Sequence, residues 1–186
     1  NITSGEGGAV ITNDENIISF VKDARLLGVE KDTEKRYEGQ RSWDFDVKHQ
    51  GYRYHMSNIF AAIGREQLKK INSIEKKRKE LVNYYLENLK DIPQIQTLDF
   101  DFKSIISHIF VVKTSKRDEL REFLLSKNIE CGIHYKPNHL LTKYKSDALP
   151  ITEKVYEEIL TLPCQLDLLK EDQDFVINTI KEFFNA

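Results

Sequence analysis

Apolar and polar residues at the start of the chain alternate in blocks that predict a strand, a turn and a helix. The short apolar run over residues 8–12 predicts a strand. Asn13 and Asp14 follow as helix-capping residues, and the apolar spacing over residues 15–27 predicts a helix that Gly28 ends. The chain therefore begins with a predicted strand–turn–helix unit.

The next sixty or so residues predict a loop, an extended segment and a long helical region. Residues 29–41 are charged and have no apolar period, which indicates a surface loop, whereas residues 42–47 alternate apolar and polar side chains as a half-buried strand does. Ser57 is the expected cap of the helix that follows. The apolar face of that helix is formed by Ile59, Phe60 and Ile63. Helical spacing then continues to Leu89, over a run too long for one compact helix.

Residues 91–93, Asp-Ile-Pro, interrupt the helical spacing, and short strands and helices are predicted after them. Strands are expected over residues 95–98, 105–113 and 129–134. Helices are expected over residues 118–127, around Val155, Tyr156, Ile159 and Leu160, and around Val176, Ile180 and Phe183. We therefore expect an α/β chain divided near Lys90, in which residues 1–90 close a larger domain and residues 91–186 form a small α+β domain.

The charge and composition of the chain exclude several classes of protein. The 28 basic and 30 acidic residues are well mixed and leave a net charge of -2, so nothing indicates a nucleic acid or an anionic membrane as a partner. The basic run over residues 76–79 lies between two glutamates in a helical stretch, which is typical of a solvated helix face. No apolar run approaches the length of a transmembrane helix, and Cys131 and Cys164 form no CxxC motif. We expect a soluble protein of the reducing cytoplasm.

Three motifs carry residue types that bind ligands. The first, Gly5-Glu6-Gly7-Gly8, is rich in glycine, but it lacks the Gly-Lys-Ser/Thr ending of a P-loop and precedes a predicted strand instead of following one. Two interpretations of this motif remain. It is either a tight turn whose glycines adopt positive φ, or a backbone kept free of side chains so that a ligand can approach closely.

The second motif, residues 51–68, places polar and aromatic side chains directly ahead of a predicted helix. Free N–H groups and the helix dipole favour an anion at the start of a helix, so a phosphate would fit there. The alternative is that Tyr52 and Tyr54 are amphipathic surface residues and that His55 merely flanks the helix cap.

The third motif, residues 132–139, ends a predicted strand in His134, Tyr135, a proline and His139. The spacing of the two histidines does not match a zinc-binding helix motif, and no cysteine or carboxylate completes a tetrahedral set of ligands. We therefore expect no metal site and prefer a polar contact with a substrate.

These motifs, in this order and at these separations, resemble the DegT/DnrJ/EryC1/StrS family of pyridoxal-phosphate-dependent sugar aminotransferases. The resemblance is carried by NITSGEGGAVITND at the start, GYRYHMSNIFAAIGREQL over residues 51–68, IHYKPNHL over residues 133–140 and LPCQLDLLKEDQDFVINTIKEFF near the end. It covers nearly the whole chain, and its specificity comes from the four segments together.

The resemblance implies fold type I of the pyridoxal-phosphate-dependent transferases, like that of aspartate aminotransferase, with this chain as its C-terminal part. In the family, the lysine that holds pyridoxal phosphate directly precedes the segment that matches Asn1–Gly8. We therefore expect no catalytic residue within the chain, a lysine immediately before Asn1, and most of the cofactor site in an N-terminal half. The implied reaction transfers an amino group, usually from glutamate, to a keto group of a nucleotide-linked sugar, for cell-surface polysaccharide or other amino-sugar biosynthesis.

The resemblance also implies roles for five residues. In the family, the loop that matches the start of the second motif crosses a dimer, and an Asn or Arg at the position of His55 reaches the neighbour's cofactor phosphate; an imidazole can still donate to a phosphate. Arg53 would add positive charge near the phosphate or the nucleotide. His134 and Tyr135 match the family's His-Tyr-x-Pro segment, which lies at the sugar nucleotide, and His139 is a further candidate for substrate contact.

Three interpretations of the activity stay open. The chain is part of a working homodimeric sugar aminotransferase, a catalytically inert fragment that serves dimerisation or nucleotide binding, or part of a dehydratase-like branch in which histidine replaces the lysine. The residue encoded before Asn1 distinguishes them. Lysine there supports amino transfer, histidine supports the dehydratase, and a start codon supports the inert fragment.

Overall fold

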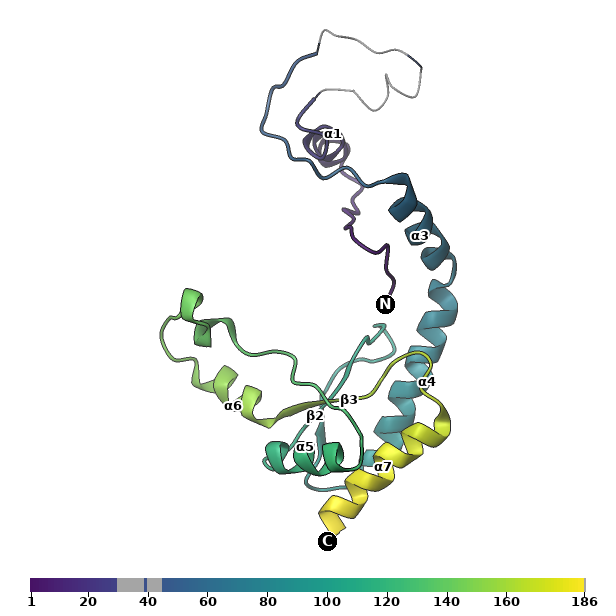
Figure 1. Ribbon diagram of the computed structural model, residues 1–186, viewed down its shortest axis with the longest axis vertical. Coiled ribbons are helices and arrows are strands. Elements are labelled where there is room, and N and C mark those ends of the chain that lie inside the picture. Colours follow the sequence, from purple (N-terminus) through teal and green to yellow (C-terminus); the bar gives the residue numbers. More distant parts are fainter. Residues whose placement is uncertain (30–38, 40–44, 186) are drawn as a thin grey trace. The chain divides into compact units, whose positions relative to one another are not determined.

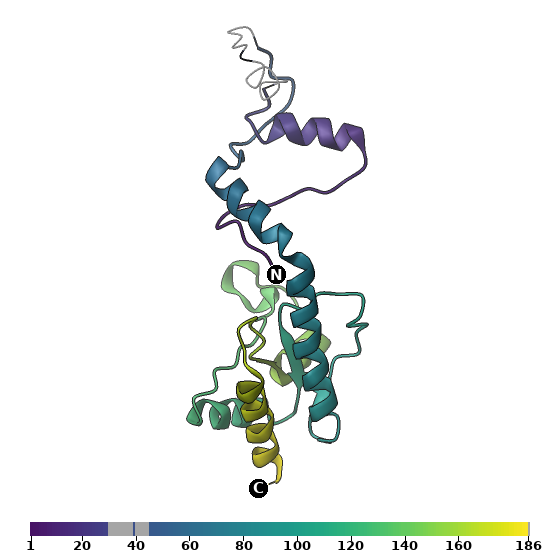
Figure 2. The same cartoon turned by 90° about the vertical axis from the view of Figure 1, so that its right-hand side faces the viewer.

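The computed structural model describes residues 1–29, 39 and 45–185, which form two compact units (Figures 1 and 2). The N-terminal unit is Ile2–Lys70, and the C-terminal unit is Ile71–Ala186 together with Asn1. Helix α4 (Ile71–Leu89) therefore groups with the C-terminal unit, although the sequence pattern placed it before a division near Lys90. The reason is that α4 supplies side chains to the core of that unit.

The N-terminal unit contains the helices α1 (Glu15–Ala24) and α3 (Asn58–Lys69). The predicted caps Asp14 and Ser57 are confirmed, because each side chain accepts a hydrogen bond from an N–H in the first turn of its helix, at 2.8 and 3.3 Å. Ala24 is the only buried hydrophobic residue among those that the structure describes in this unit. The apolar face predicted for α3 is mostly exposed within the unit.

The strands expected in the N-terminal unit and the end of its first helix differ from the sequence-based predictions. The strand predicted over residues 8–12 is wrong, because this run forms no β-ladder with any described segment. Helix α1 ends three residues earlier than expected, because Leu27 and Gly28 adopt left-handed φ values of 65° and 76°. The strand predicted over residues 42–47 is reduced, in its described part, to a single bridge between Val47 and Val29. The predicted loop over residues 29–41 falls largely outside the described residues.

The C-terminal unit is built on a three-stranded antiparallel sheet (Figure 1). Its strands are β1 (Gln96–Thr97), β2 (Phe110–Lys113) and β3 (Ile159–Leu162), in the spatial order β1-β2-β3. The register pairs Phe110 with Leu162 and Val112 with Leu160. All four of these side chains are buried, so this register brings the apolar positions of both strands into the core.

Helices and short 3-10 turns complete this unit. They are α4, α5 (Arg117–Ser126), η1 (Asn138–Leu140), η2 (Thr142–Tyr144), α6 (Pro150–Glu158) and α7 (Lys170–Asn185). Helix α7 packs against both α4 and α5, and α5 also contacts β3 (Figures 1 and 2). Helix α5 lies within one residue of its predicted position at both ends, which confirms that prediction.

One continuous hydrophobic core joins the sheet of the C-terminal unit to its helices. The rings of Tyr85 and Phe110 stack in this core with their centroids 4.9 Å apart. Its fully buried members also include Val82, Leu89, Val112, Leu120, Leu124, Leu160, Leu162 and Ile180. Each such side chain contributes about 1.5–3 kcal/mol when it leaves water. The unit therefore has the internal support of an independent small domain.

One helix prediction and three strand predictions in this unit need correction. Ile159 and Leu160 do not continue a helical face. They belong to β3, because their backbones pair with β2. The strand predicted over residues 129–134 is reduced to a bridge between Gly132 and Thr161. The predicted strands over 95–98 and 105–113 are present only as β1 and β2.

Candidate functional site

The loop ahead of α3 is attached to the turn that follows α1. Three backbone hydrogen bonds of 2.6–3.0 Å hold it, from Tyr52 N–H to the Ala24 carbonyl, from Leu27 N–H to the Tyr52 carbonyl and from Tyr54 N–H to the Arg25 carbonyl. The backbone is thus fixed on both sides of Arg53 and directly before His55.

Two glycines allow this loop and the turn to approach closely. A Cβ on Gly51 would collide with the backbone of Leu27 and Gly28. Gly28 itself has φ 76°, a conformation that other L-residues rarely adopt. Glycine at these two positions therefore positions the loop, a role that the sequence motif alone did not reveal.

The side chains of the loop are exposed and separate into an aromatic pair and two basic groups. The rings of Tyr52 and Tyr54 stack with centroids 5.1 Å apart and planes 9° from parallel. Arg53 lies between them in sequence, and both Arg53 and His55 are exposed. The loop therefore offers hydrogen-bond donors to a ligand without having to unpack a core.

The start of α3 is electrostatically suited to an anion. Its first turn contains no acidic residue, whereas the first turns of α1, α5 and α7 contain one or two. Carboxylates at such positions neutralise the positive end of the helix dipole, so this end stays uncompensated at α3. His55 lies two residues before the Ser57 cap, where an imidazole N–H can add a further donor.

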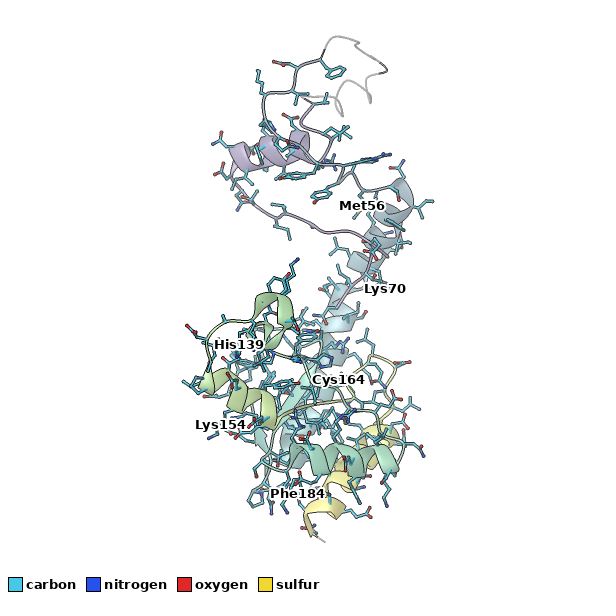
Figure 3. All side chains as sticks on the ribbon, turned by 60° about the vertical axis from the view of Figure 1, so that its left-hand side comes forward. Met56, Lys70, His139, Lys154, Cys164 and Phe184 are labelled. Carbon is cyan, nitrogen blue, oxygen red and sulfur yellow. The ribbon has the colours of Figure 1, made fainter. Side chains whose placement is uncertain are left out.

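A pocket of about 780 Å³ opens within the N-terminal unit beside this helix start. Its lining combines the first and second motifs with α1 and consists of Glu6, Gly7, Gly8, Ala9, Val10, Val21, Arg25, Tyr54, His55, Met56, Ser57 and Phe60. Figure 3 labels Met56 beside the start of α3. The pocket is large enough for a small-molecule ligand.

The glycines of the first motif lie in positions compatible with both interpretations considered from sequence. Gly5 has φ 85°, as a tight turn requires. Gly7 and Gly8 line the pocket, and a Cβ on Gly7 would collide with the Met56 side chain. The backbone is therefore kept free of side chains where the pocket passes it.

The basic side chains that line this pocket are only partly those expected from the sequence. His55 lines the pocket, but Arg53 is not among the lining residues. Arg25, from the turn after α1, is among them and was missed by sequence reasoning, because no local motif marks it. A guanidinium, an imidazole and an open helix start are hydrogen-bond donors that suit a phosphate. The pocket also contains one carboxylate, that of Glu6, which would repel a phosphate.

In the C-terminal unit, His134 and Tyr135 lie in the segment that follows the bridge at Gly132. The Nδ1 atom of His134 is 2.9 Å from the Thr161 hydroxyl, and its ring meets the Tyr135 ring edge-on with centroids 4.8 Å apart. The Tyr135 side chain is exposed, and that of His134 is half-buried. The structure therefore brings these two predicted residues together at the surface.

His139 occupies a different kind of position, in η1 ahead of α6 (Figure 3). Its side chain is buried, and its Nε2 atom lies 3.0 Å from the Glu153 carboxylate. Glu153 also accepts a hydrogen bond from the Leu149 N–H at 2.9 Å. This backbone bond, with a smaller contribution from His139, holds the pKa of Glu153 below its usual value. His139 therefore connects η1 to the first turn of α6, which favours a supporting role.

Two features are absent from the described part of the chain. In residues 1–29, 39 and 45–185, no group of three or more His, Cys, Asp or Glu side chains is arranged to hold a metal ion. No helix in the same ranges has the length and apolar character needed to cross a membrane.

Solved structures with the same fold define the class of protein. The sugar aminotransferase CalS13 from Micromonospora echinospora superposes with a TM-score of 0.83 at 22% identity, over 97% of this chain and 48% of that one. A putative sugar aminotransferase, Spr1654 from Streptococcus pneumoniae in its PMP form, gives a TM-score of 0.78 at 25% identity, over 96% and 47% of the two chains. The fold is thus the C-terminal portion of fold type I of the pyridoxal-phosphate-dependent aminotransferases, as predicted.

The chain belongs to the DegT/DnrJ/EryC1/StrS aminotransferase family, whose model matches residues 1–181. The uncharacterized protein MJ1066 of Methanocaldococcus jannaschii is 32% identical over 98% of this chain and 50% of its own length. The UDP-4-amino-4,6-dideoxy-N-acetyl-beta-L-altrosamine transaminase of Campylobacter jejuni is 31% identical over 96% of this chain and 48% of its own length. The chain therefore spans about half the length of these relatives, and the predicted resemblance to a pyridoxal-phosphate-dependent family is confirmed.

Proposed function

We propose that this chain is the C-terminal part of an aminotransferase that moves an amino group from an amino-acid donor, glutamate by preference, to a keto group on a nucleotide-linked sugar. The observation that carries the proposal is the family match over residues 1–181, which includes the first three segments of the resemblance in full and the fourth as far as Lys181. The Campylobacter jejuni relative, named for a UDP-linked amino sugar, supports the substrate class. When bound, pyridoxal phosphate supplies the electron sink for amino transfer.

The N-terminal unit would hold the phosphate end of the cofactor. His55 and Arg25 both line the pocket beside the open start of α3, and each can donate to phosphate oxygens. Arg53 would contribute long-range positive charge or contact the nucleotide, because it is exposed in the loop ahead of α3 but does not line the pocket. The lysine that carries the cofactor is expected outside these 186 residues, directly before Asn1.

The C-terminal unit would contact the sugar nucleotide. His134 and Tyr135 are neighbours at its surface and present an imidazole and a phenol, both of which bond oxygen-rich ligands. His139 was expected to touch substrate directly. Its burial and its bond to Glu153 instead support an indirect role, in which it holds the segment between η1 and α6.

We further propose a homodimer in which residues 51–63 lie at or near the interface between two copies. The exposed tyrosine pair and the exposed Ile59 and Ile63 side chains on α3 are consistent with such a contact. A monomer at high concentration of the complete protein would contradict this proposal.

The test uses the complete protein, including the residues encoded before Asn1. It is supplied with glutamate and a keto form of a UDP-linked N-acetylhexosamine, and formation of 2-oxoglutarate and of the amino sugar is followed together. We expect both products in equal amounts, and borohydride reduction followed by peptide mapping should locate the cofactor on the lysine before Asn1. A histidine at that position, or cofactor loading without amino transfer, would overturn the proposal.

A further inference from the structure

The imidazole of His134 is enclosed on several sides by other residues of the C-terminal unit. Its Nδ1 atom faces the Thr161 hydroxyl at 2.9 Å, and the Tyr135 ring meets it edge-on. It also lies directly over Gly132: a Cβ there would overlap the ring carbon Cε1 and lie only 3.1 and 3.2 Å from the ring nitrogens Nδ1 and Nε2. The ring therefore occupies a cradle that a side chain on Gly132 would fill.

The two residues that shape this cradle are fixed to each other. Gly132 N–H donates to the Thr161 carbonyl at 3.0 Å, and Thr161 N–H donates to the Gly132 carbonyl at 2.8 Å. Thr161 belongs to β3, whose four residues are all buried and paired with β2. The ring thus rests against residues that are tied to the sheet of the core, which restricts its orientation.

The burial of Thr161 also favours one position for the proton of the imidazole ring. Thr161 is buried, and the only hydrogen bond that its hydroxyl makes among the described residues is the one to His134 Nδ1. If the hydroxyl accepted from an Nδ1–H, its own O–H would be left unpaired in the interior, at a cost of about 1–3 kcal/mol. The hydroxyl therefore donates to Nδ1, and the neutral ring carries its proton on Nε2.

We propose that His134 is a preset Nε2–H donor, and that Thr161 and Gly132 are the positioning residues that hold it in this orientation and tautomer. The identity of the acceptor rests on the proposed function, which supplies an oxygen of the nucleotide-linked sugar. A neutral donor of this kind binds its ligand without first having to become an imidazolium. Neither Thr161 nor Gly132 touches the ligand in this proposal.

The first test reads the tautomer directly, by nitrogen NMR of the histidine-labelled chain at mildly alkaline pH, with the His134 signals assigned from a His134→Gln variant. We expect Nδ1 of His134 to be unprotonated and Nε2 to be protonated. Thr161→Val should make His134 a mixture of the two tautomers, and Thr161→Ser should restore the single form. Thr179→Val is the matched control, because Thr179 is also buried but bonds the Phe175 carbonyl.

The second test measures the consequence in the complete protein with the UDP-linked keto sugar. Thr161→Val should raise KM for the sugar by about threefold to tenfold, the effect of one misplaced hydrogen bond, with little change in kcat. A protonated Nδ1 in the unaltered chain, or a single unchanged tautomer in Thr161→Val, would overturn the inference. The expected tautomers combined with an unchanged KM in His134→Gln would instead overturn the proposed contact between His134 and the sugar nucleotide.

Discussion

The two units of this chain differ most in how they bury their apolar side chains. The C-terminal unit encloses a continuous core in which side chains such as Leu120 and Leu160 have no exposed surface. In the described part of the N-terminal unit, Ile11 is 96% exposed and Ile59 is 72% exposed. The C-terminal unit is thus stabilised by its own packing, whereas the N-terminal unit leaves exposed the apolar residues that would form its core.

This difference matches the division of the proposed site. The C-terminal unit can orient His134 by itself, since Gly132 and Thr161 both belong to it. The N-terminal unit provides a loop, a helix start and the pocket beside them, but it leaves large apolar side chains exposed. We therefore expect the sugar-nucleotide end of the site to be intact in this chain and the cofactor end to require additional chain.

The largest expected effect comes from separating the two units. A fragment of residues 71–186 should unfold in one cooperative transition in urea, because its core is complete. A fragment of residues 1–70 should show no cooperative transition, because it buries too little apolar surface to offset the loss of conformational entropy. Circular dichroism during urea titration checks both fragments.

The two cysteines give an independent readout for the same comparison, because both belong to the C-terminal unit. Burial raises the pKa of Cys131 to about 12 and also raises the pKa of Cys164, so both thiols should react slowly with iodoacetamide until the unit unfolds. A cooperative transition in residues 1–70, or rapid alkylation of both thiols in folded 71–186, would contradict the contrast between the units.

A smaller effect is expected from single leucines in the intact chain. Leu120→Ala should lower the free energy of unfolding by about 2–5 kcal/mol, because it leaves a cavity in the core. Leu68→Ala is the matched control on α3, where the side chain is 57% exposed, and it should change stability by less than about 0.5 kcal/mol. Urea midpoints of the two variants, measured by the same spectroscopic signal, test this, and equal losses would show that the N-terminal unit has a core of its own.

Several elements of the fold were predictable from local signals in the sequence. The caps Asp14 and Ser57 and the extent of α5 follow from residue types and apolar spacing over a few positions. Ile159 and Leu160 were misassigned, because their spacing from Val155 and Tyr156 suits a helix while pairing with β2 decides the outcome. That partner is almost fifty residues away in the sequence, so no local pattern contains it.

The candidate site shows the same limit. His55, His134 and Tyr135 could be proposed as site residues because they stand in recognisable motifs. Arg25 and Thr161 were missed, because each acquires its role only when a distant segment folds against it. For Arg25 this segment is the loop ahead of α3, and for Thr161 it is the segment that follows Gly132. His139 was assigned from its motif, yet its burial and its bond to Glu153 could not be read from sequence.

An intermediate effect is expected at Arg117, the buried guanidinium of the C-terminal unit. It donates to the Tyr156 carbonyl at 2.8 Å, near the end of α6, and its Nε donates to Asp118 at 2.6 Å. Arg117→Met should cost about 1–3 kcal/mol, because it leaves a carbonyl without its partner. Arg121→Met, on the exposed side of the same helix, is the control, and similar urea midpoints for the two variants would contradict the role of Arg117.

The smallest effect concerns pH. Hydrogen bonds hold the folded pKa of Glu153 below the usual 4.5, so its contribution to stability is present above that pH and is lost as the pH falls through the folded pKa. Glu153→Gln should therefore reduce the loss of stability of the C-terminal unit between about pH 5 and about pH 3, whereas the exposed Glu157→Gln should not. Urea midpoints across this range provide the measurement. Parallel pH profiles for the two variants would argue against the hydrogen bonds that Glu153 accepts.

The most direct test of the account asks whether the two ends of the site can be damaged separately in the complete protein. Cofactor content after dialysis and KM for the UDP-linked sugar are measured together for Arg25→Gln/His55→Gln and for His134→Gln, with the exposed His108→Gln as a control. We expect the double variant to lose cofactor at least about tenfold more readily, while His134→Gln keeps its cofactor and raises KM by about threefold to tenfold. Equal loss of cofactor in both variants, or an unchanged KM in His134→Gln, would contradict it.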